Sequence, residues 1–243
     1  MERHIKNLNW MEFGDLVKKI KGVILPIGTM EAHGCTNLGT DITIPEYQAE
    51  YLAEKLDLLI APSINYGITR TLLPYSGSMT VTQESFIAYV SEISQSLIRN
   101  GFEWILYLNG HGGHIQELTD IGRSLWKETG GKSISIHWWE LCEKLTREFF
   151  GEAGGHAGLD ETAMVMAANP DLVKENLYSN SIIFQVRAGA QPYPQGGTIL
   201  LYEEKQGKPR FDKREADSYA NEVNKHLETY IKEVLVGWRK GQV

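Results

Sequence analysis

The feature that most constrains this chain is a short apolar run that ends in a glycine and leads directly into side chains able to bind a metal ion. The run is Val23–Ile27 and the glycine is Gly28, a pattern typical of a buried strand that stops at a turn. Glu31 and His33 lie two residues apart, and Asp41 follows after a loop, so the three side chains can meet at one strand end. Carboxylate oxygen and imidazole nitrogen suit Zn, Mn or Fe(II). The alternative interpretation is a solvated loop without a metal.

Two further glycine-rich clusters carry histidines. Residues 103–108 indicate another short strand, which leads directly into Asn-Gly-His-Gly-Gly-His at residues 109–114. The third cluster spans residues 154–161 and places His156 and Glu161 before an apolar helical stretch. The glycines let the backbone turn sharply, and Asn109 can brace its turn through the side-chain amide. Incidental histidines in a glycine turn are the alternative, but repetition of the pattern favours a metal site.

Strand-like and helix-like segments alternate along the chain, which predicts the α/β class with a parallel sheet covered by helices on both faces. The 243 residues, of which 42% are hydrophobic, suffice for one large core, so we expect a single domain over residues 1–243. Residues 66–79 predict a long loop on a pocket rim. Further strands are predicted over residues 58–64, 133–137, 181–186 and 198–202, and helices over residues 46–56, 83–99, 115–125, 140–150, 160–168 and 214–238.

Charge and composition narrow the class of partner. The formal charge is -7 and no run of Lys or Arg occurs, which argues against nucleic acid or an anionic membrane as partner and favours a small-molecule substrate. No segment resembles a signal peptide or a membrane span, so a cytoplasmic protein is expected. Cys35 and Cys142 are the two cysteines, too few for a disulfide framework, and Cys35 is expected to be a free thiol beside the site.

The three clusters resemble the signatures of the creatininase (creatinine amidohydrolase) family. The matching segments are residues 26–34 with 39–41, residues 109–113, and residues 156–162, in the family's order. This resemblance implies a dinuclear metal hydrolase on a three-layer α/β/α sandwich with a mostly parallel central sheet. It implies two divalent ions per chain (Zn, Mn or Fe) and a homo-oligomer, a hexamer in the family. Its members include creatinine hydrolases, a formamide deformylase and a peptide-trimming enzyme.

The resemblance also implies roles for single residues. Asp41 is expected to bridge two ions, with Glu31 and His111 on one ion and His33 on the other. An activated water would then attack a carbonyl that the ions polarise. His156 matches the family's proton-transfer histidine. An imidazole whose pKa lies near its ordinary value of about 6.5 is suited to protonate a leaving nitrogen.

The chain departs from the family pattern at the second ion. Where the creatinine-cleaving members have a metal-binding glutamate, two residues after the motif histidine, this chain has Gly113. Glu161 is the candidate that replaces this ligand, and His114 is the alternative. The same departure makes creatinine a less favoured substrate.

Trp138 and Trp139 follow a predicted strand at the edge where the metal loops gather. Alternation sends them to opposite faces, so one is expected in the core and the other on a wall that stacks a flat or cyclic substrate. His114 is counted with them as a substrate-binding candidate.

Three functions compete at this point. The favoured one is an amidohydrolase that cleaves a small non-peptide C–N bond, in a cyclic amide or a formamide. The second is a hydrolase that opens a cyclic keto-sugar at a C–C bond, since the same ions polarise any carbonyl. The third is a non-catalytic binding protein on the same fold.

Overall fold

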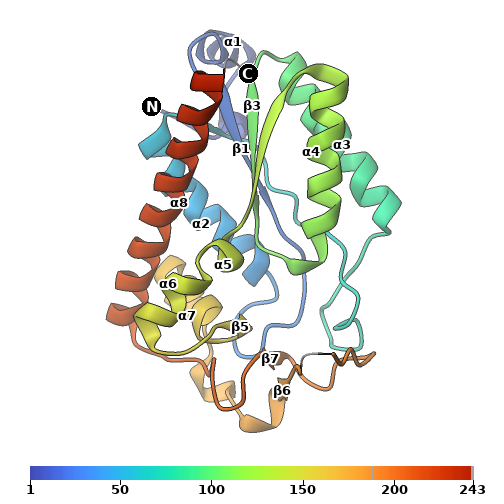
Figure 1. Ribbon diagram of the computed structural model, residues 1–243, viewed down its shortest axis with the longest axis vertical. Coiled ribbons are helices and arrows are strands. Elements are labelled where there is room, and N and C mark those ends of the chain that lie inside the picture. Colours follow the sequence, from blue (N-terminus) through green and yellow to red (C-terminus); the bar gives the residue numbers. More distant parts are fainter. Residues whose placement is uncertain (188, 242–243) are drawn as a thin grey trace.

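A parallel four-stranded sheet forms the centre of the protein (Figure 1). The structure, a computed structural model, describes residues 1–187 and 189–241. The strand order is β2 (Leu59–Ile60), β1 (Gly22–Ile27), β3 (Trp104–Asn109) and β4 (Lys132–His137). Because all four strands are parallel, the ends of β1 and β3 meet at one edge of the sheet, with Ile27 beside Asn109. This edge carries the candidate site.

Helices cover both faces of the sheet, so the predicted three-layer α/β/α sandwich is confirmed. Alternating side chains of β3 divide between the two layers: Leu106 and Leu108 pack on one side and Ile105 and Tyr107 on the other, all fully buried. The first side is covered by α2 (Thr40–Leu56), α7 (Leu159–Ala168) and α8 (Lys213–Gly241), and the second by α3 (Gln83–Arg99) and α4 (Ile115–Thr129). Helix α1 (Trp10–Val17) lies at the end of the sheet where the strands begin (Figure 1).

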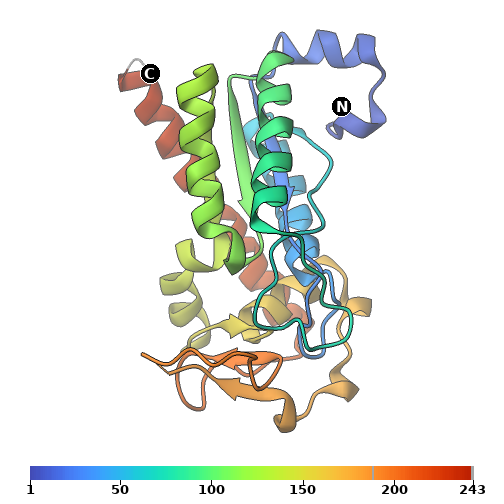
Figure 2. The same cartoon turned by 90° about the vertical axis from the view of Figure 1, so that its right-hand side faces the viewer.

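A second, smaller sheet lies beyond the carboxyl ends of the central strands (Figure 2). It has the order β5 (Gly155–His156), β7 (Ile199–Leu201) and β6 (Ile183–Gln185). His156 pairs with Leu200 in the antiparallel β5–β7 ladder. The sequence did not predict this sheet, because β5 has only two residues and pairs with a strand far along the chain. It holds the third glycine-rich cluster against the site.

Several element boundaries differ from the predictions. Helix α2 begins at Thr40 instead of at residue 46, so Asp41 lies in its first turn. The helix predicted over residues 140–150 is two helices, α5 (Trp138–Leu141) and α6 (Glu143–Phe150). The strand predicted over residues 58–64 shrinks to β2, and residues 181–182 belong to a 3-10 turn before β6. None of the helices in the described part of the chain combines the length and apolar character needed to cross a membrane.

Candidate metal centre and active site

Two glycines position the first cluster. Gly28 ends β1 and Gly110 follows β3, and a Cβ atom at either glycine would lie 2.2 Å or 2.1 Å, respectively, from the backbone carbonyl oxygen of Asp41. Only residues without a side chain allow the first turn of α2 to approach both strand ends this closely. The Asp41 side chain is therefore placed between the loop that carries Glu31 and His33 and the loop that carries His111.

Asp41 contacts a different histidine with each of its carboxylate oxygens. Its Oδ1 lies 2.9 Å from His33 Nε2, and its Oδ2 lies 2.8 Å from His111 Nδ1. Asp41 and His33 are almost completely buried. This arrangement meets the geometric requirement of the predicted bridging role, in which one carboxylate serves two ions.

Two sets of candidate ligands share Asp41. The first ligand group is Glu31, Asp41 and His111, and the second ligand group is His33, Asp41 and Glu161; within each, the donor atoms lie within 4.8 Å of one another. Glu31 Oε2 is 3.3 Å from His111 Nδ1, and Glu161 Oε2 is 3.8 Å from His33 Nε2. The residues predicted as ligands are thus brought together, with Glu161 in the place proposed for it.

Backbone carbonyls fix the orientation of both ligand histidines. His33 Nδ1 lies 2.9 Å from the carbonyl oxygen of Glu31, and His111 Nε2 lies 2.9 Å from that of Ile68. Because a carbonyl oxygen only accepts, these ring nitrogens carry the proton. His33 Nε2 and His111 Nδ1 are left facing the carboxylates, as metal ligation requires.

Electrostatics at the cluster favour positive charge at its centre. Burial alone lowers the pKa of His33, but the nearby Asp41 and Glu161 carboxylates raise that pKa to about 10. The same competition, with Glu31 and Asp41 as the carboxylates, raises the pKa of His111 to about 9. Although burial opposes ionisation of Asp41, the two histidines hold its pKa well below the ordinary value. Burial raises the pKa of Glu161 to about 8.

The donor set fits a divalent metal ion. His33 Nε2 and Asp41 Oδ2 are buried, and their short contacts with Asp41 Oδ1 and His111 Nδ1 lack hydrogen-bond geometry, although buried polar atoms are normally paired. Both atoms lie at the centre of the cluster. Mixed imidazole and carboxylate donors suit Zn, Mn or Fe(II). Mg and Ca, in contrast, prefer sites made of oxygen donors alone.

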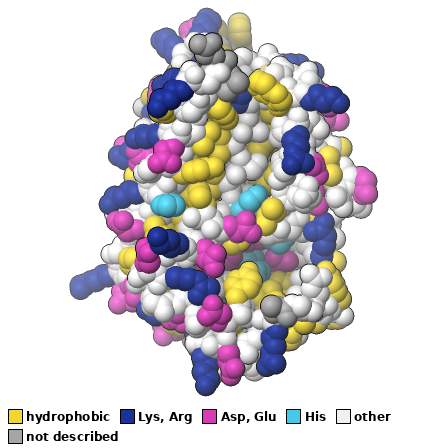
Figure 3. Space-filling model, viewed as in Figure 1, with side chains coloured by type: hydrophobic (Ala, Val, Ile, Leu, Met, Phe, Trp, Pro, Cys, Tyr) yellow, Lys and Arg dark blue, Asp and Glu magenta, His cyan; other side chains and the backbone are white. Residues whose placement is uncertain are grey.

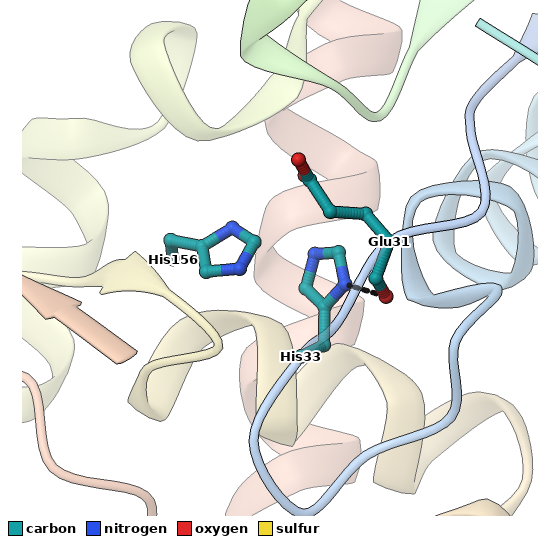
Figure 4. Close-up of side chains that lie close together, drawn as sticks. All are labelled: Glu31, His33 and His156. Atoms are coloured by element: carbon teal, nitrogen blue, oxygen red, sulfur yellow. Dashed lines mark hydrogen bonds between the residues drawn. The ribbon is translucent and has the colours of Figure 1, made fainter. Parts of the chain in front are cut away.

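His156 lies beside the second ligand group (Figure 4). Its Nε2 is 2.8 Å from the carbonyl oxygen of Ala32, and its ring centroid is 4.1 Å from that of His33. The carbonyl keeps the proton on Nε2, so Nδ1 is the unprotonated nitrogen. The expected pKa near 6.5 is wrong, because burial and the neighbouring His33 lower the pKa of His156 to about 3. With Glu31 and His33 it also forms a third group of possible metal donors.

A cavity of about 550 Å³ opens over the cluster, and Glu31, Asp41, His111, His156 and Glu161 all line it. Figure 3 shows histidine and acidic side chains together near the middle of this face, beside apolar ones. The long loop predicted over residues 66–79 supplies part of the wall, as expected. That loop supplies Ile68, Arg70 and Leu72, and the remaining wall includes Trp139, Arg147, Tyr193, Leu200 and Tyr202.

The two tryptophans separate as the alternation argument expected, although both lie on the short helix α5. Trp138 is fully buried in the core, so the structure places it away from the substrate space. Trp139 lines the cavity. Only Trp139 is therefore in a position to stack on a substrate.

His114 lies outside the ligand cluster and does not line the cavity. It is completely buried, and both ring nitrogens are engaged: Nε2 accepts from the backbone N–H of Ile68 at 3.0 Å, and Nδ1 donates to Asn109 Oδ1 at 3.2 Å. Neither nitrogen is left for a metal or a substrate. The structure thus favours Glu161 over His114 as the ligand of the second group.

Sequence reasoning missed several contributors to the site. The Ile68 carbonyl that orients His111 has no residue-type signal, because any residue supplies a carbonyl. Tyr193 lies in the loop between β6 and β7, and Tyr202 directly follows β7, so both reach the cavity from connections of the second sheet, which was not predicted. Arg70 was detectable only as a charge within the long loop. Its guanidinium donates to the Gly113 carbonyl oxygen at 3.2 Å and to Glu117 Oε1 at 2.9 Å.

The sequence is similar to one protein family and to several characterised proteins. The sequence model of the creatininase family, described as creatinine amidohydrolase, matches residues 6–200. A creatinine amidohydrolase of Pseudomonas putida is 26% identical over 70% of this chain and 73% of its own length. A mycofactocin precursor peptide peptidase of Mycobacterium ulcerans is 26% identical over 62% of this chain and 60% of its own length. A 3-dehydro-scyllo-inosose hydrolase of Thermotoga maritima is 28% identical over 45% of this chain and 36% of its own length.

Solved structures share the fold. A crystal structure of creatinine amidohydrolase superposes with a TM-score of 0.80 at 17% identity, covering 96% of this chain and 97% of that one. A manganese form of creatininase gives a TM-score of 0.75 at 19% identity, with 96% and 98% covered. A Zn–Zn form of a creatininase variant gives 0.76 at 18% identity, with the same coverage. At these identities the likeness concerns the fold.

Proposed function

We propose that this chain, which belongs to the creatininase family, is a metal-dependent amidohydrolase. Its substrate would be a small non-peptide amide, cyclic or formyl, whose C–N bond it cleaves. The observation that carries the proposal is the pair of ligand groups that share Asp41 at the floor of a cavity. Members of the family are metal-dependent hydrolases. The family model covers all three glycine-rich clusters, so the assignment does not depend on one motif.

Two divalent ions would be held by the two ligand groups. Glu31 and His111 would bind one ion, His33 and Glu161 the other, and Asp41 both. Zinc or manganese is expected, since forms of creatininase with each metal share the fold. The ions would activate a water for attack and polarise the amide carbonyl.

His156 is positioned to move the proton that amide cleavage requires. Its Nε2–H is held by the Ala32 carbonyl oxygen, which leaves Nδ1 free to accept a proton from the attacking water and to pass it to the leaving nitrogen. Because burial keeps the pKa of His156 low, the ring is neutral at neutral pH and begins the cycle as a base. Without this transfer the nitrogen would leave as a poor anionic group.

The cavity wall suits a substrate with a flat or cyclic part. Trp139, Tyr193 and Tyr202 contribute aromatic surface, and Arg70 and Arg147 contribute guanidinium groups that are each paired with a glutamate. A volume of about 550 Å³ lies within the range of sites for drug-sized ligands, roughly 300–1,000 Å³. It accommodates a cyclic amide or a formamide that carries a further ring. The predicted homo-oligomer and the cytoplasmic location stay predictions.

A second candidate function is the opening of a cyclic keto-sugar. It is favoured by the partial likeness to the 3-dehydro-scyllo-inosose hydrolase, which covers 45% of this chain and includes part of the family region. The same ion pair would polarise a ketone, and only the bond that breaks would differ.

A substrate screen tests the proposal directly. Protein reconstituted with Zn or Mn is incubated with lactams, aromatic formamides, short peptides and cyclic keto-sugars, and release of amine, formate or acid is measured. Turnover of a lactam or formamide that disappears in a Glu31→Gln variant supports the proposal. Turnover of the keto-sugar alone selects the second candidate, turnover of peptides alone contradicts the non-peptide assignment, and no turnover in a protein that holds no metal indicates a binding protein.

A further inference from the structure

The first ligand group depends on a contact that the second does not share. His33 is oriented by the carbonyl of Glu31, two residues away in the same loop. His111 is oriented by the carbonyl of Ile68, which belongs to the long loop between β2 and α3. Something must therefore hold that loop in place for His111 to present Nδ1 to the ion.

His114 holds the same residue, Ile68, through its backbone N–H. The Ile68 N–H donates to His114 Nε2 at 3.0 Å, while the Ile68 carbonyl oxygen accepts from His111 Nε2 at 2.9 Å. The loop passes close enough to His114 that a Cβ atom at Gly67 would lie 2.0 Å from its Nε2. The backbone at residues 67–68 is thus shaped to fit the His114 ring.

The His114 ring is fixed in turn by two contacts. Its Nδ1–H donates to Asn109 Oδ1 at 3.2 Å, the oxygen that also accepts from the backbone N–H of His111 at 3.1 Å. Its face stacks on Phe86 of α3, with ring centroids 4.3 Å apart and planes 18° apart. Because the Ile68 N–H can only donate, His114 Nε2 is the accepting nitrogen and Nδ1 carries the proton.

We infer that His114 is a positioning residue for one ion only. By holding the Ile68 backbone N–H and Asn109, it fixes the ring of His111 and so sets the affinity of the first ligand group, while the orientation of His33 in the second ligand group does not depend on it. The inference rests on the proposed metal function. Removal of a group that orients a ligand histidine typically lowers metal affinity ten- to a hundredfold, roughly. That loss is expected for the ion on His111 alone.

The experiment is a metal titration of the apoprotein, with competition against a chromophoric chelator. His114→Phe retains an aromatic ring against Phe86 but removes both hydrogen bonds. It is combined separately with His33→Ala, which leaves the ion on His111, and with His111→Ala, which leaves the ion on His33. We expect the remaining ion to bind roughly ten- to a hundredfold more weakly in the first combination and unchanged in the second.

Two further variants separate hydrogen bonding from stability. Phe86→Leu removes the stacking partner but leaves both His114 hydrogen bonds, so metal affinity should be retained even if thermal stability falls. His114→Gln restores an acceptor toward Ile68 and should recover part of the lost affinity. If His114→Phe does not fold, the smaller but still selective loss expected of His114→Gln is measured instead. Equal weakening of both ions, no weakening of either, or the same selective loss in Phe86→Leu would overturn the inference. Absence of metal binding in the wild type would instead defeat the proposed function, on which the inference depends.

Discussion

The two ligand groups share the Asp41 carboxylate, but their other ligands are oriented in different ways. In the second group, His33 is oriented from its own loop, and Glu161 accepts from the backbone N–H of Ala157 four residues earlier, at 2.5 Å. In the first group, His111 depends on a carbonyl from residue 68, far away in the sequence. A motif can thus contain a ligand without containing the group that orients it. The second group is locally braced, whereas the first relies on the packing of the long loop.

The largest effect is expected where the two groups meet. Asp41→Ala removes the carboxylate that faces both His33 Nε2 and His111 Nδ1, so both ions should be lost and with them all detectable turnover. Metal analysis of the purified variant checks this. Retention of one ion at wild-type affinity would mean that Asp41 is a ligand of only one group and is not shared.

Replacing one ligand histidine at a time should remove one ion and leave the other. His33→Ala and His111→Ala should each lose mainly one ion, because each removes a ligand from one group only. Turnover should fall severely in both, since two ions are proposed to act together. The check is the metal content per chain after dialysis against a weak chelator. A variant that loses both ions would show that its group is required to assemble the other.

The His156→Ala variant tests whether His156, beside the second ligand group, binds a metal ion or only transfers a proton. In His156→Ala the metal content should stay near that of the wild type, because its Nε2 is engaged by the Ala32 carbonyl oxygen. The kcat should fall by roughly two to four orders of magnitude, the usual contribution of a positioned general acid or base. Steady-state kinetics and metal analysis on the same sample measure both. Loss of one ion would instead make His156 a ligand, through the third donor group that it forms with Glu31 and His33.

The smallest effect on catalysis is expected at the cavity wall. Trp139→Ala should raise KM by roughly tenfold, the order expected when one aromatic contact of about 1–2 kcal/mol is lost, with both ions retained. Trp138→Ala is the matched control, because that ring is buried in the core and its removal should cost about 3–5 kcal/mol of stability. Thermal unfolding and KM are measured for both. An unchanged KM in Trp139→Ala would remove it from the substrate wall.

Much of the fold could be predicted because its signals are local. Apolar runs such as residues 23–27 and 104–108 have the length and composition of buried strands, and the alternation with helices determines a parallel sheet with two helical layers. The ligand residues were accessible for the same reason: they directly follow these strands or open a helix. Asn109 was expected to brace its turn, and its Oδ1 does accept from the backbone N–H of His111 at 3.1 Å.

What could not be predicted depends on contacts between distant segments. The second sheet pairs the two residues of β5 with β7, more than forty positions later, and no periodicity exists in so short a strand. The pKa of His156 could not be anticipated, since it follows from burial beside His33. The role of His114 was obscured for a similar reason. A histidine in a glycine-rich loop resembles a ligand until the partners of both ring nitrogens are known.

The measurement that tests the account most directly is the metal content of wild-type protein after reconstitution with Zn or Mn and removal of excess metal. Because Asp41 faces one histidine with each carboxylate oxygen, and each oxygen lies in its own ligand group, we expect about two ions per chain. Elemental analysis against a quantitative amino-acid analysis gives this number. A value of one, or of none, would contradict the shared two-ion site on which the proposed hydrolase rests.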